Sequence, residues 1–244
     1  MKIKNLCIIP VYNEELRLNS LIKKINRERE KIKNINFLFI NNGSNDRSLA
    51  ILKENKCSFI NLKKNMGVGY ALIIGLKFAL KNNYEILIHL AGNGKMLPSE
   101  IQLFLKQIIN NKIDFVSGSR FLKYGNYKSN PLIRIILIQI LSFCISIIYK
   151  KKITDATCGF RAFKAKIFKK SINLLDKKKF YTYGYEYYSM GKVINSNKIK
   201  FVEIPVTMQY PRKGSYSKMT PIFDWLTIIN AWLLAFIDNK KLIN

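Results

Sequence analysis

Short apolar runs alternate with longer segments of helical periodicity along the first half of the chain. The apolar runs end in polar or glycine-containing loops, as buried strands do. Between them, apolar positions recur every three or four residues, which predicts amphipathic helices. The predicted strands are 6–10, 37–40, 57–62, 86–90 and 114–121, and the predicted helices are 14–29, a segment beginning near 47, 70–80 and 101–109. This alternation predicts an α/β fold with a Rossmann-like, mostly parallel sheet flanked by helices.

Two long apolar segments follow in the second half. Residues 132–149 are almost uninterruptedly apolar over 18 residues, near the lower limit for a membrane span, but they include Arg134. Residues 222–237 form a second apolar helix, with Trp225 and Trp232 seven residues apart on one face. Basic residues flank both segments on both sides, so no charge asymmetry orients a span. We therefore predict helices that lie in a membrane interface, anchored by the two tryptophans.

Three further segments complete the pattern. A helix is expected at 166–174 and a strand at 201–206. Residues 181–188 are dense in tyrosine around Glu186. With 244 residues, 48% of them hydrophobic, the chain can bury one sizeable core. One domain with a smaller appendage is therefore expected.

The formal net charge of +27 is weak evidence for nucleic-acid binding. Much of the excess is lysine accompanied by abundant asparagine and isoleucine, a combination that a biased genome composition could produce. The chain also lacks zinc-finger spacing, a basic heptad region and an aromatic RNA-binding motif. An anionic membrane surface or a phosphorylated substrate accounts for the charge equally well, and no nucleic-acid partner is expected.

Cysteine and glycine spacing exclude several cofactor sites. The four cysteines form no C-x-x-C pair, and the single histidine, His89, does not complete a zinc motif with them, so reduced thiols and a cytosolic chain are expected. The chain begins without an apolar signal core. The glycine loop at 65–69 does not continue as G-x-x-G, and no Walker sequence occurs, so no organic cofactor is predicted.

The most specific pattern lies in the loops after the predicted strands, where α/β sheets bind ligands. In chain order the chain reads I-I-P-V-Y-N-E-E, N-N-G-S-N-D, N-M-G-V-G-Y-A, A-G-N-G-K-M-L-P, S-G-S-R-F, D-A-T-C-G-F-R-A-F, V-E-I-P-V and R-K-G-S-Y-S-K. No single piece is specific. Together, in this order, they resemble the family 2 glycosyltransferases of GT-A fold, and within them the branch similar to dolichol-phosphate (polyprenyl-phosphate) mannose synthase.

The resemblance implies a domain division and a donor site. It implies a GT-A domain at 1–218, with a nucleotide-binding half at about 1–118 and an acceptor half at about 119–218, followed by an interfacial helix at 219–244. The two positions Asn41 and Asn42 stand where the family usually has aspartates, which puts base recognition in doubt. The residues implied in donor binding are Pro10, Tyr12, Asn13, Glu14, Asn42, Ser44, Asn65, Gly67, Ala91, Gly92, Asn93, Lys95, Arg212 and Lys218.

The loop at 91–95 matches the Asp-x-Asp motif of the family, whose carboxylates hold Mg²⁺ or Mn²⁺ against the donor diphosphate. Ala91 and Asn93 replace both aspartates. A hard divalent ion prefers anionic oxygens, so the Asn93 amide is at best a weak ligand. The resemblance therefore implies a metal whose binding is weakened here. Lys95, Arg212, Lys213 and Lys218 are cations that could offset the diphosphate charge instead.

Acceptor binding and catalysis are implied at a few later positions. Arg120 and Arg134 fall where the related enzymes hold the lipid phosphate, and the candidate catalytic residues are Asn93, Arg120 and Glu186. A polyprenyl phosphate needs no general base, because its oxygen is already anionic at neutral pH. The base motif that many hydroxyl-glycosylating relatives carry is absent, which favours the lipid phosphate. Asp155 and Glu186 are the late acids that could serve as a base, and Asp155 could equally cap a turn.

The expected function is inverting transfer of a hexose from a nucleotide sugar to polyprenyl phosphate or another lipid-linked acceptor. The expected place is the cytoplasmic face of a membrane, with peripheral or interfacial attachment, and an integral membrane partner is left open. Two alternatives stay open: transfer to a sugar hydroxyl in surface-polysaccharide or glycolipid synthesis, and a non-catalytic protein that binds a nucleotide sugar.

Overall fold

The apolar runs of the first half form parallel strands. The computed structural model describes residues 4–32, 34–127, 131–210 and 221–238. β1 pairs in parallel with both β2 and β4, and β2 pairs in parallel with β3. The elements of this half are β1 (Asn5–Val11), α1 (Glu15–Lys31), β2 (Ile35–Asn42), α2 (Ser48–Glu54), β3 (Phe59–Leu62), α3 (Val68–Lys81) and β4 (Ile86–His89).

The sheet continues into the second half of the chain. Within the described residues, seven strands form one sheet in the order β3-β2-β1-β4-β6-β5-β7. β6 runs antiparallel to β4 and β5, while β5 and β7 are parallel, so the predicted mostly parallel α/β sheet is confirmed. These elements are the 3₁₀ turn η1 (Pro98–Glu100), α4 (Ile101–Ile109), β5 (Phe115–Ser119), β6 (Arg161–Lys164) and β7 (Phe201–Pro205).

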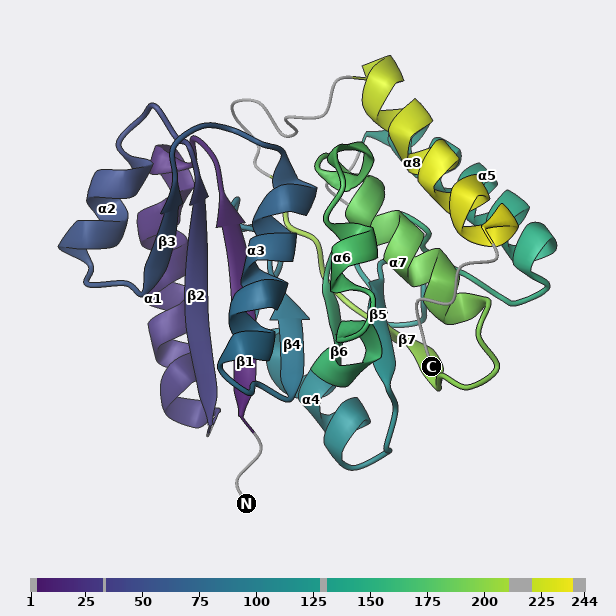
Figure 1. Cartoon of the computed structure of the whole chain (residues 1–244), viewed down its shortest axis with the longest axis horizontal. Coiled ribbons are helices and arrows are strands. Elements are labelled where there is room, and N and C mark those ends of the chain that lie inside the picture. Colours follow the sequence, from purple (N-terminus) through teal and green to yellow (C-terminus); the bar gives the residue numbers. More distant parts are fainter. Residues whose placement is uncertain (1–3, 33, 128–130, 211–220, 239–244) are drawn as a thin grey trace.

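Helices cover both faces of the sheet and enclose two apolar cores (Figure 1). Alternate strand residues point to opposite faces, so that Ile8 of β1 packs toward α3 while Ile9 packs toward α1. α1 and α4 cover one face, and α3 and α7 (Gly184–Ile194) cover the other. Both faces are therefore buried, as parallel strands require.

Some elements of the second half differ from the prediction. The expected helix at 166–174 is wrong: a 3₁₀ turn η2 (Ala165–Phe168) and a short helix α6 (Ile172–Leu175) take its place. The break lies at Ser171, which is buried and whose backbone N–H donates to the Phe168 carbonyl, so the chain tightens before the next turn. β6, the 3₁₀ turn η3 (Lys178–Phe180) and α7 were not predicted.

The two apolar helices, α5 (Leu132–Tyr149) and α8 (Pro221–Ile237), pack beyond α7 (Figure 1). The Tyr149 hydroxyl donates to the backbone carbonyl of Trp232 at 2.7 Å, and their rings meet edge to face at 5.5 Å. Gly191 of α7 makes the close approach possible, because a Cβ there would lie 2.6 Å from both Tyr149 Oη and Ala235 Cβ. Trp232 is fully buried, so its predicted role as an interfacial anchor is wrong in this structure.

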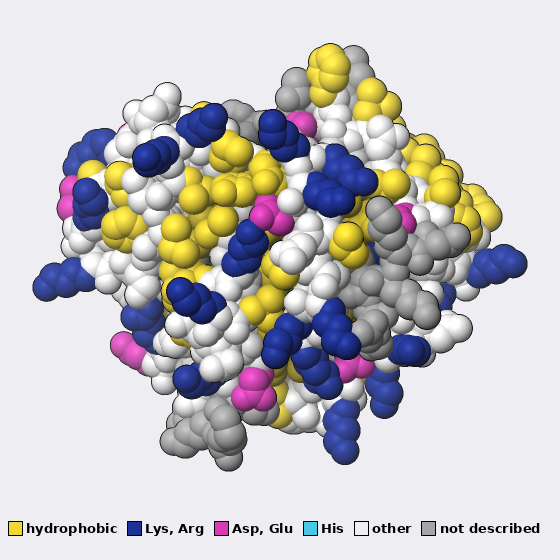
Figure 2. Space-filling model, in the orientation of Figure 1, with side chains coloured by type: hydrophobic (Ala, Val, Ile, Leu, Met, Phe, Trp, Pro, Cys, Tyr) yellow, Lys and Arg dark blue, Asp and Glu magenta, His cyan; other side chains and the backbone are white. Residues whose placement is uncertain are grey.

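Large apolar side chains nevertheless stay exposed on the outer sides of both helices. Figure 2 shows them along the outer side of α8. α5 is the one helix among the described residues that is long and apolar enough to cross a membrane by length and composition, with a mean hydropathy of 2.3. The exposed apolar residues, named here the outer stripe, are Leu132, Ile133, Ile136, Leu137, Ile140, Phe143 and Ile147 of α5 and Phe223, Leu226, Leu233, Phe236 and Ile237 of α8.

Replacing Trp232 with Ala should destabilise the protein strongly, because it leaves a large cavity between α5, α7 and α8. We expect a loss of about 3–5 kcal/mol in the free energy of unfolding. Trp225→Ala, at a half-buried position of the same helix, is the matched control and should cost much less. Urea unfolding followed by circular dichroism measures both, and equal small losses would contradict the buried position of Trp232.

Candidate functional site

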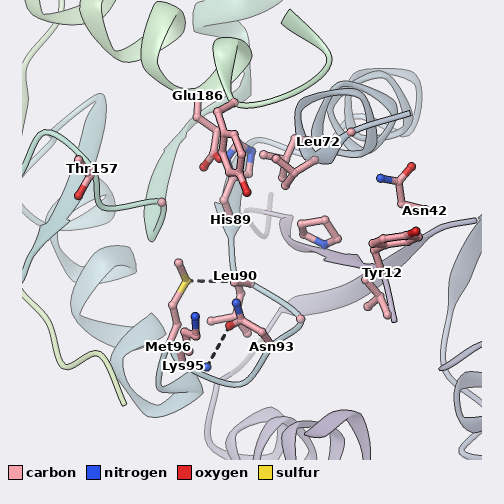
Figure 3. A pocket seen from close by; sticks show the side chains of 18 of the residues that line it. Tyr12, Asn42, Leu72, His89, Leu90, Asn93, Lys95, Met96, Thr157 and Glu186 are labelled. Carbon is pink, nitrogen blue, oxygen red and sulfur yellow. Dashed lines mark hydrogen bonds between the residues drawn. The ribbon is translucent and has the colours of Figure 1, made fainter. Parts of the chain in front are cut away.

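A pocket of about 430 Å³ lies beyond the carboxyl ends of β1, β2 and β4. Strand order changes direction at this point, since β2 lies on one side of β1 and β4 on the other. Such a switch point is where open α/β sheets bind ligands. The helices α3 and α7 supply the opposite wall, and Figure 3 shows Leu72 and Glu186 reaching in from that side.

The walls on the β1 and β2 side contain six of the fourteen predicted donor residues. Pro10, Tyr12, Glu14, Asn42, Asn65 and Gly67 all line the pocket. Asn42 is held by its neighbours: its amide donates to Asn65 Oδ1 at 2.9 Å, and its carbonyl oxygen accepts from the Met66 N–H at 3.0 Å. The β2 end and the glycine loop therefore form one rigid edge.

Asn13 and Ser44, also predicted to bind the donor, are not among the lining residues. The Asn13 N–H donates to Ser44 Oγ at 3.0 Å, and Asn13 Oδ1 accepts from the Asn45 N–H at 2.9 Å. Asn13 also has a positive φ of 52°, which asparagine tolerates better than most residues. These two residues tie the loop after β1 to the loop after β2 behind the pocket wall.

The glycine loop before α3 packs against the turn that leads into α7. The Gly69 N–H donates to the Thr182 carbonyl at 2.7 Å, and the Tyr70 N–H donates to the Tyr181 carbonyl at 2.9 Å. A Cβ at Gly67 would lie 2.2 Å from the Tyr181 carbonyl oxygen, and one at Gly69 would lie 2.1 Å from the Phe180 carbonyl oxygen. The two glycines are thus required by backbone-to-backbone contact.

The loop at 91–95, which the sequence resemblance matched to Asp-x-Asp, lies at the base of the pocket (Figure 3). Ala91, Gly92, Asn93 and Lys95 line it. The Asn93 side-chain oxygen accepts from the Lys95 N–H at 3.2 Å. Among the described residues, no group of three or more His, Cys, Asp or Glu is placed to hold a metal ion. Lys95 is only 9% exposed and holds its ammonium 4.9 Å from the Tyr210 ring centroid, so this loop presents a buried cation.

Arg120 lines the pocket as one half of a buried ion pair. Its Nε and Nη2 donate to the two carboxylate oxygens of Asp155 at 2.6 and 2.7 Å, and its Nη1 donates to the Tyr210 hydroxyl at 3.0 Å. Burial alone would lower the pKa of the Arg120 guanidinium, but the charge and hydrogen bonds of Asp155 raise it overall. Asp155 is held in turn by Glu203, whose carboxylate accepts from the Asp155 N–H. Asp155 thus serves as the counter-ion of Arg120, a role that its sequence position did not indicate.

Glu186 projects from the first turn of α7 into the pocket (Figure 3). Burial raises the pKa of its carboxyl group, and the nearby charge of Arg161 opposes that shift. His89, at the end of β4, borders the same region. Burial and the Arg161 charge lower the pKa of His89 to about 3, so its imidazole is neutral at ordinary pH.

The first turns of the two apolar helices reach the pocket. Arg134 of α5 and Asp224 of α8 both line it, close to Tyr183, whose pKa is raised first by burial and then by the charges of Asp224 and Glu186. The residues beside Arg134 in the chain, Leu132 and Ile133, are exposed. The pocket therefore lies next to one end of the outer stripe.

The structure brings together most of the site residues that the sequence predicts, from loops far apart in the chain. Arg212 and Lys218 lie outside the described residues, as does Lys213. Sequence reasoning missed His89, Thr157, Tyr183 and Asp224. The position of His89 at the end of a buried strand, next to the replaced metal loop, was the signal that could have identified it.

Comparisons with known proteins agree with this arrangement. The sequence model of glycosyl transferase family 2 matches residues 6–172, more than half of the chain. The UDP-N-acetylglucosamine–dolichyl-phosphate N-acetylglucosaminyltransferase of Methanococcus voltae is 28% identical, over 83% of this chain and 84% of its own. The polyprenol monophosphomannose synthase of Mycolicibacterium smegmatis is 24% identical, over 89% and 81% of the two chains.

A solved structure shows the same fold. Glucosyl-3-phosphoglycerate synthase from Mycobacterium tuberculosis, in complex with Mn²⁺, UDP and glucosyl-3-phosphoglycerate, matches with a TM-score of 0.66 at 13% identity, covering 96% of this chain and 79% of that one. The expected GT-A fold is confirmed. By its sequence match and its fold, the chain belongs to glycosyl transferase family 2.

Proposed function

We propose that this glycosyltransferase moves a hexose from a nucleotide sugar to a polyprenyl phosphate. The observation that carries the proposal is the position of Arg134, which lines the pocket from a helix whose neighbouring side chains are exposed and apolar. A lipid phosphate needs a cation for its head and an apolar surface for its chain, and α5 offers both. The relatives from Methanococcus voltae and Mycolicibacterium smegmatis are named as enzymes acting on dolichyl phosphate and polyprenol, which supports the same acceptor class.

The proposed reaction needs little acid–base chemistry from the protein. A phosphate oxygen of the acceptor attacks the anomeric carbon of the sugar, and the bond from that carbon to the nucleoside diphosphate breaks with inversion. The attacking oxygen is already anionic, so no proton has to be removed. The chain's task is to hold donor and acceptor in line and to offset the developing charge on the leaving diphosphate.

Two cations suit the two phosphate-bearing groups. Lys95 lies in the loop at the base of the pocket, where it would face the donor diphosphate. Arg134 lies at the end of the pocket bordered by the apolar helices, where it would face the acceptor phosphate. Arg120 is already bound to Asp155, so we assign it mainly to shaping the wall between them.

A protein of this fold can bind a divalent ion, since the similar structure from Mycobacterium tuberculosis contains Mn²⁺ and UDP. The residues of this chain fit it poorly: Ala91 offers no side-chain ligand, and the Asn93 oxygen already accepts from the Lys95 N–H. We propose that Lys95 offsets the diphosphate charge in this chain, and no step here depends on a metal.

An acceptor hydroxyl remains a second candidate because of Glu186. A sugar hydroxyl needs a general base, and a carboxyl whose pKa is raised by burial suits that role. Mass spectrometry of the products formed from a panel of nucleotide sugars, with polyprenyl phosphate and sugar acceptors in parallel, separates the two functions. No product with any acceptor, despite nucleotide-sugar binding, would indicate a non-catalytic protein.

Attachment to a membrane surface should depend on the outer stripe. Phe143→Asp combined with Ile147→Asp places charges where apolar side chains would enter the lipid interface, and we expect vesicle binding to fall at least about tenfold. Leu16→Asp, at an exposed apolar residue of α1, is the matched control and should change nothing. Co-sedimentation with anionic vesicles measures this, and unchanged binding of the double variant would exclude the stripe as the contact.

Arg134→Ala should impair use of the acceptor and spare donor binding. Charge-assisted contacts to phosphate are worth about 1.5–3 kcal/mol, so kcat/KM for polyprenyl phosphate should fall about 10- to 100-fold. Lys123→Ala, which removes an exposed cation, is the control. Arg120→Ala is a poorer probe, because it leaves Asp155 charged and buried. An equal loss of nucleotide-sugar affinity in Arg134→Ala would refute the assignment to the acceptor.

Chelators should have little effect on donor binding or turnover. We expect less than about a twofold change in EDTA, and about tenfold weaker nucleoside diphosphate binding in Lys95→Met, because a buried cation is lost. Ala91→Asp with Asn93→Asp should make diphosphate binding depend on Mn²⁺. Isothermal titration calorimetry with and without EDTA gives the binding terms. Loss of wild-type turnover in stoichiometric chelator, rescued by micromolar Mn²⁺, would show that a metal is used after all.

A further inference from the structure

The Glu186 carboxyl is buried at the pocket wall without a partner from the described residues. The side chain is in a residue only 7% exposed, and it lines the pocket. The hydrogen bonds at Glu186 use its backbone carbonyl, which accepts from Arg161 Nη1 and, at 3.1 Å, from Ser189 Oγ. Its two carboxyl oxygens receive none within the described part of the chain. Buried polar groups are nearly always hydrogen-bonded, so this carboxyl is poised for a ligand.

Arg161 is buried next to Glu186 and hydrogen-bonds to the backbone rather than to the Glu186 carboxyl. Arg161 is 1% exposed on β6, and its Nε donates to the Cys158 carbonyl at 3.0 Å. Its guanidinium donates hydrogen bonds to the backbone carbonyls of Cys158 and Glu186, and its charge lowers the pKa of the Glu186 carboxyl against the effect of burial. The carboxylate therefore keeps its acceptor oxygens available.

His89 lies in the same part of the pocket and also has hydrogen-bonding atoms without partners among the described residues. It stands opposite Arg161 in the β4–β6 register, with its ring packed 5.1 Å from Phe163 and 5.9 Å from Tyr185. Neither of its ring nitrogens has a hydrogen-bond partner among the described residues, and neither has Arg161 Nη2. One end of the pocket is thus lined by an acceptor carboxyl and a neutral imidazole, and the buried guanidinium of Arg161 lies behind them.

This chemistry suits hydroxyl groups better than phosphate. A hydroxyl both donates and accepts, whereas a phosphate would meet the Glu186 carboxyl and finds better partners at Lys95 and Arg134. Space is also kept open at this point: a Cβ at Gly159 would lie 2.9 Å from Glu186 Oε1. We propose that Glu186 accepts hydrogen bonds from hydroxyl groups of the transferred sugar, with His89 beside it and Arg161 buried behind it, and that this subsite selects a neutral hexosyl group. The assignment rests on the proposed glycosyl transfer.

The test compares binding of nucleotides with and without the sugar. Calorimetry with UDP, UDP-N-acetylglucosamine, GDP and GDP-mannose shows which nucleotide binds and how much affinity the sugar adds. In Glu186→Gln we expect that added affinity to fall about tenfold while nucleoside diphosphate affinity stays within about twofold. Gly159→Ala should lower the affinity added by the sugar in the same way, because the new Cβ displaces the Glu186 carboxyl. Glu100→Gln is the matched control: burial raises the pKa of that carboxyl too, but Glu100 does not line the pocket.

The outcomes separate failure of the sugar subsite from failure of the proposed glycosyl transfer. An unchanged sugar contribution in Glu186→Gln and Gly159→Ala would overturn the subsite while leaving glycosyl transfer intact. An equal loss of diphosphate and sugar-nucleotide binding would also overturn it, because Glu186 would then support the whole pocket. If the wild-type protein binds none of the four nucleotides, the proposed function fails, and the sugar subsite fails with it.

Discussion

A buried ion pair joins the parts of the chain that meet beside the pocket. Arg120 follows β5, Asp155 precedes β6, and Glu203 of β7 accepts hydrogen bonds from the backbone of both Thr154 and Asp155. Each charge is acceptable at this depth only because the other is present; stranding one of them typically costs about 3–5 kcal/mol. The pair therefore ties the ends of β5, β6 and β7 together, and the pocket wall that contains Arg120 depends on it.

The same pair changes the electrostatics of the site. An arginine in a pocket suggests a phosphate ligand, but the Asp155 carboxylate already occupies the Nε–Nη2 edge of the Arg120 guanidinium. Lys95 at the base of the pocket and Arg134 at its apolar end also line it. The two cations lie at different places in the pocket, and Glu186 reaches in from α7 on the opposite wall. The pocket therefore has regions of different chemistry.

Periodicity predicted the first half of the fold well because its strands and helices each have a single buried face or are wholly buried. α4 and α5 were predicted with their observed bounds, Ile101–Ile109 and Leu132–Tyr149. β6 was missed because four residues beginning with a buried arginine show no strand pattern; its existence depends on β4 and β5 on either side. Trp232 was misplaced for a related reason: an apolar helix does not reveal which of its faces meets another helix, and Tyr149 and Gly191 decide that.

Site residues were predictable where a loop follows a strand, as with Tyr12 and Asn93, and unpredictable where an ion pair decides the role of the side chain, as with Asp155.

The contact of Gly67 and Gly69 with the backbone at 180–182 has a mechanical consequence. Backbone atoms lie against backbone atoms at this contact, without a flexible side chain between them. A shift of the glycine loop would therefore also shift the start of α7, the helix from which Glu186 reaches the pocket.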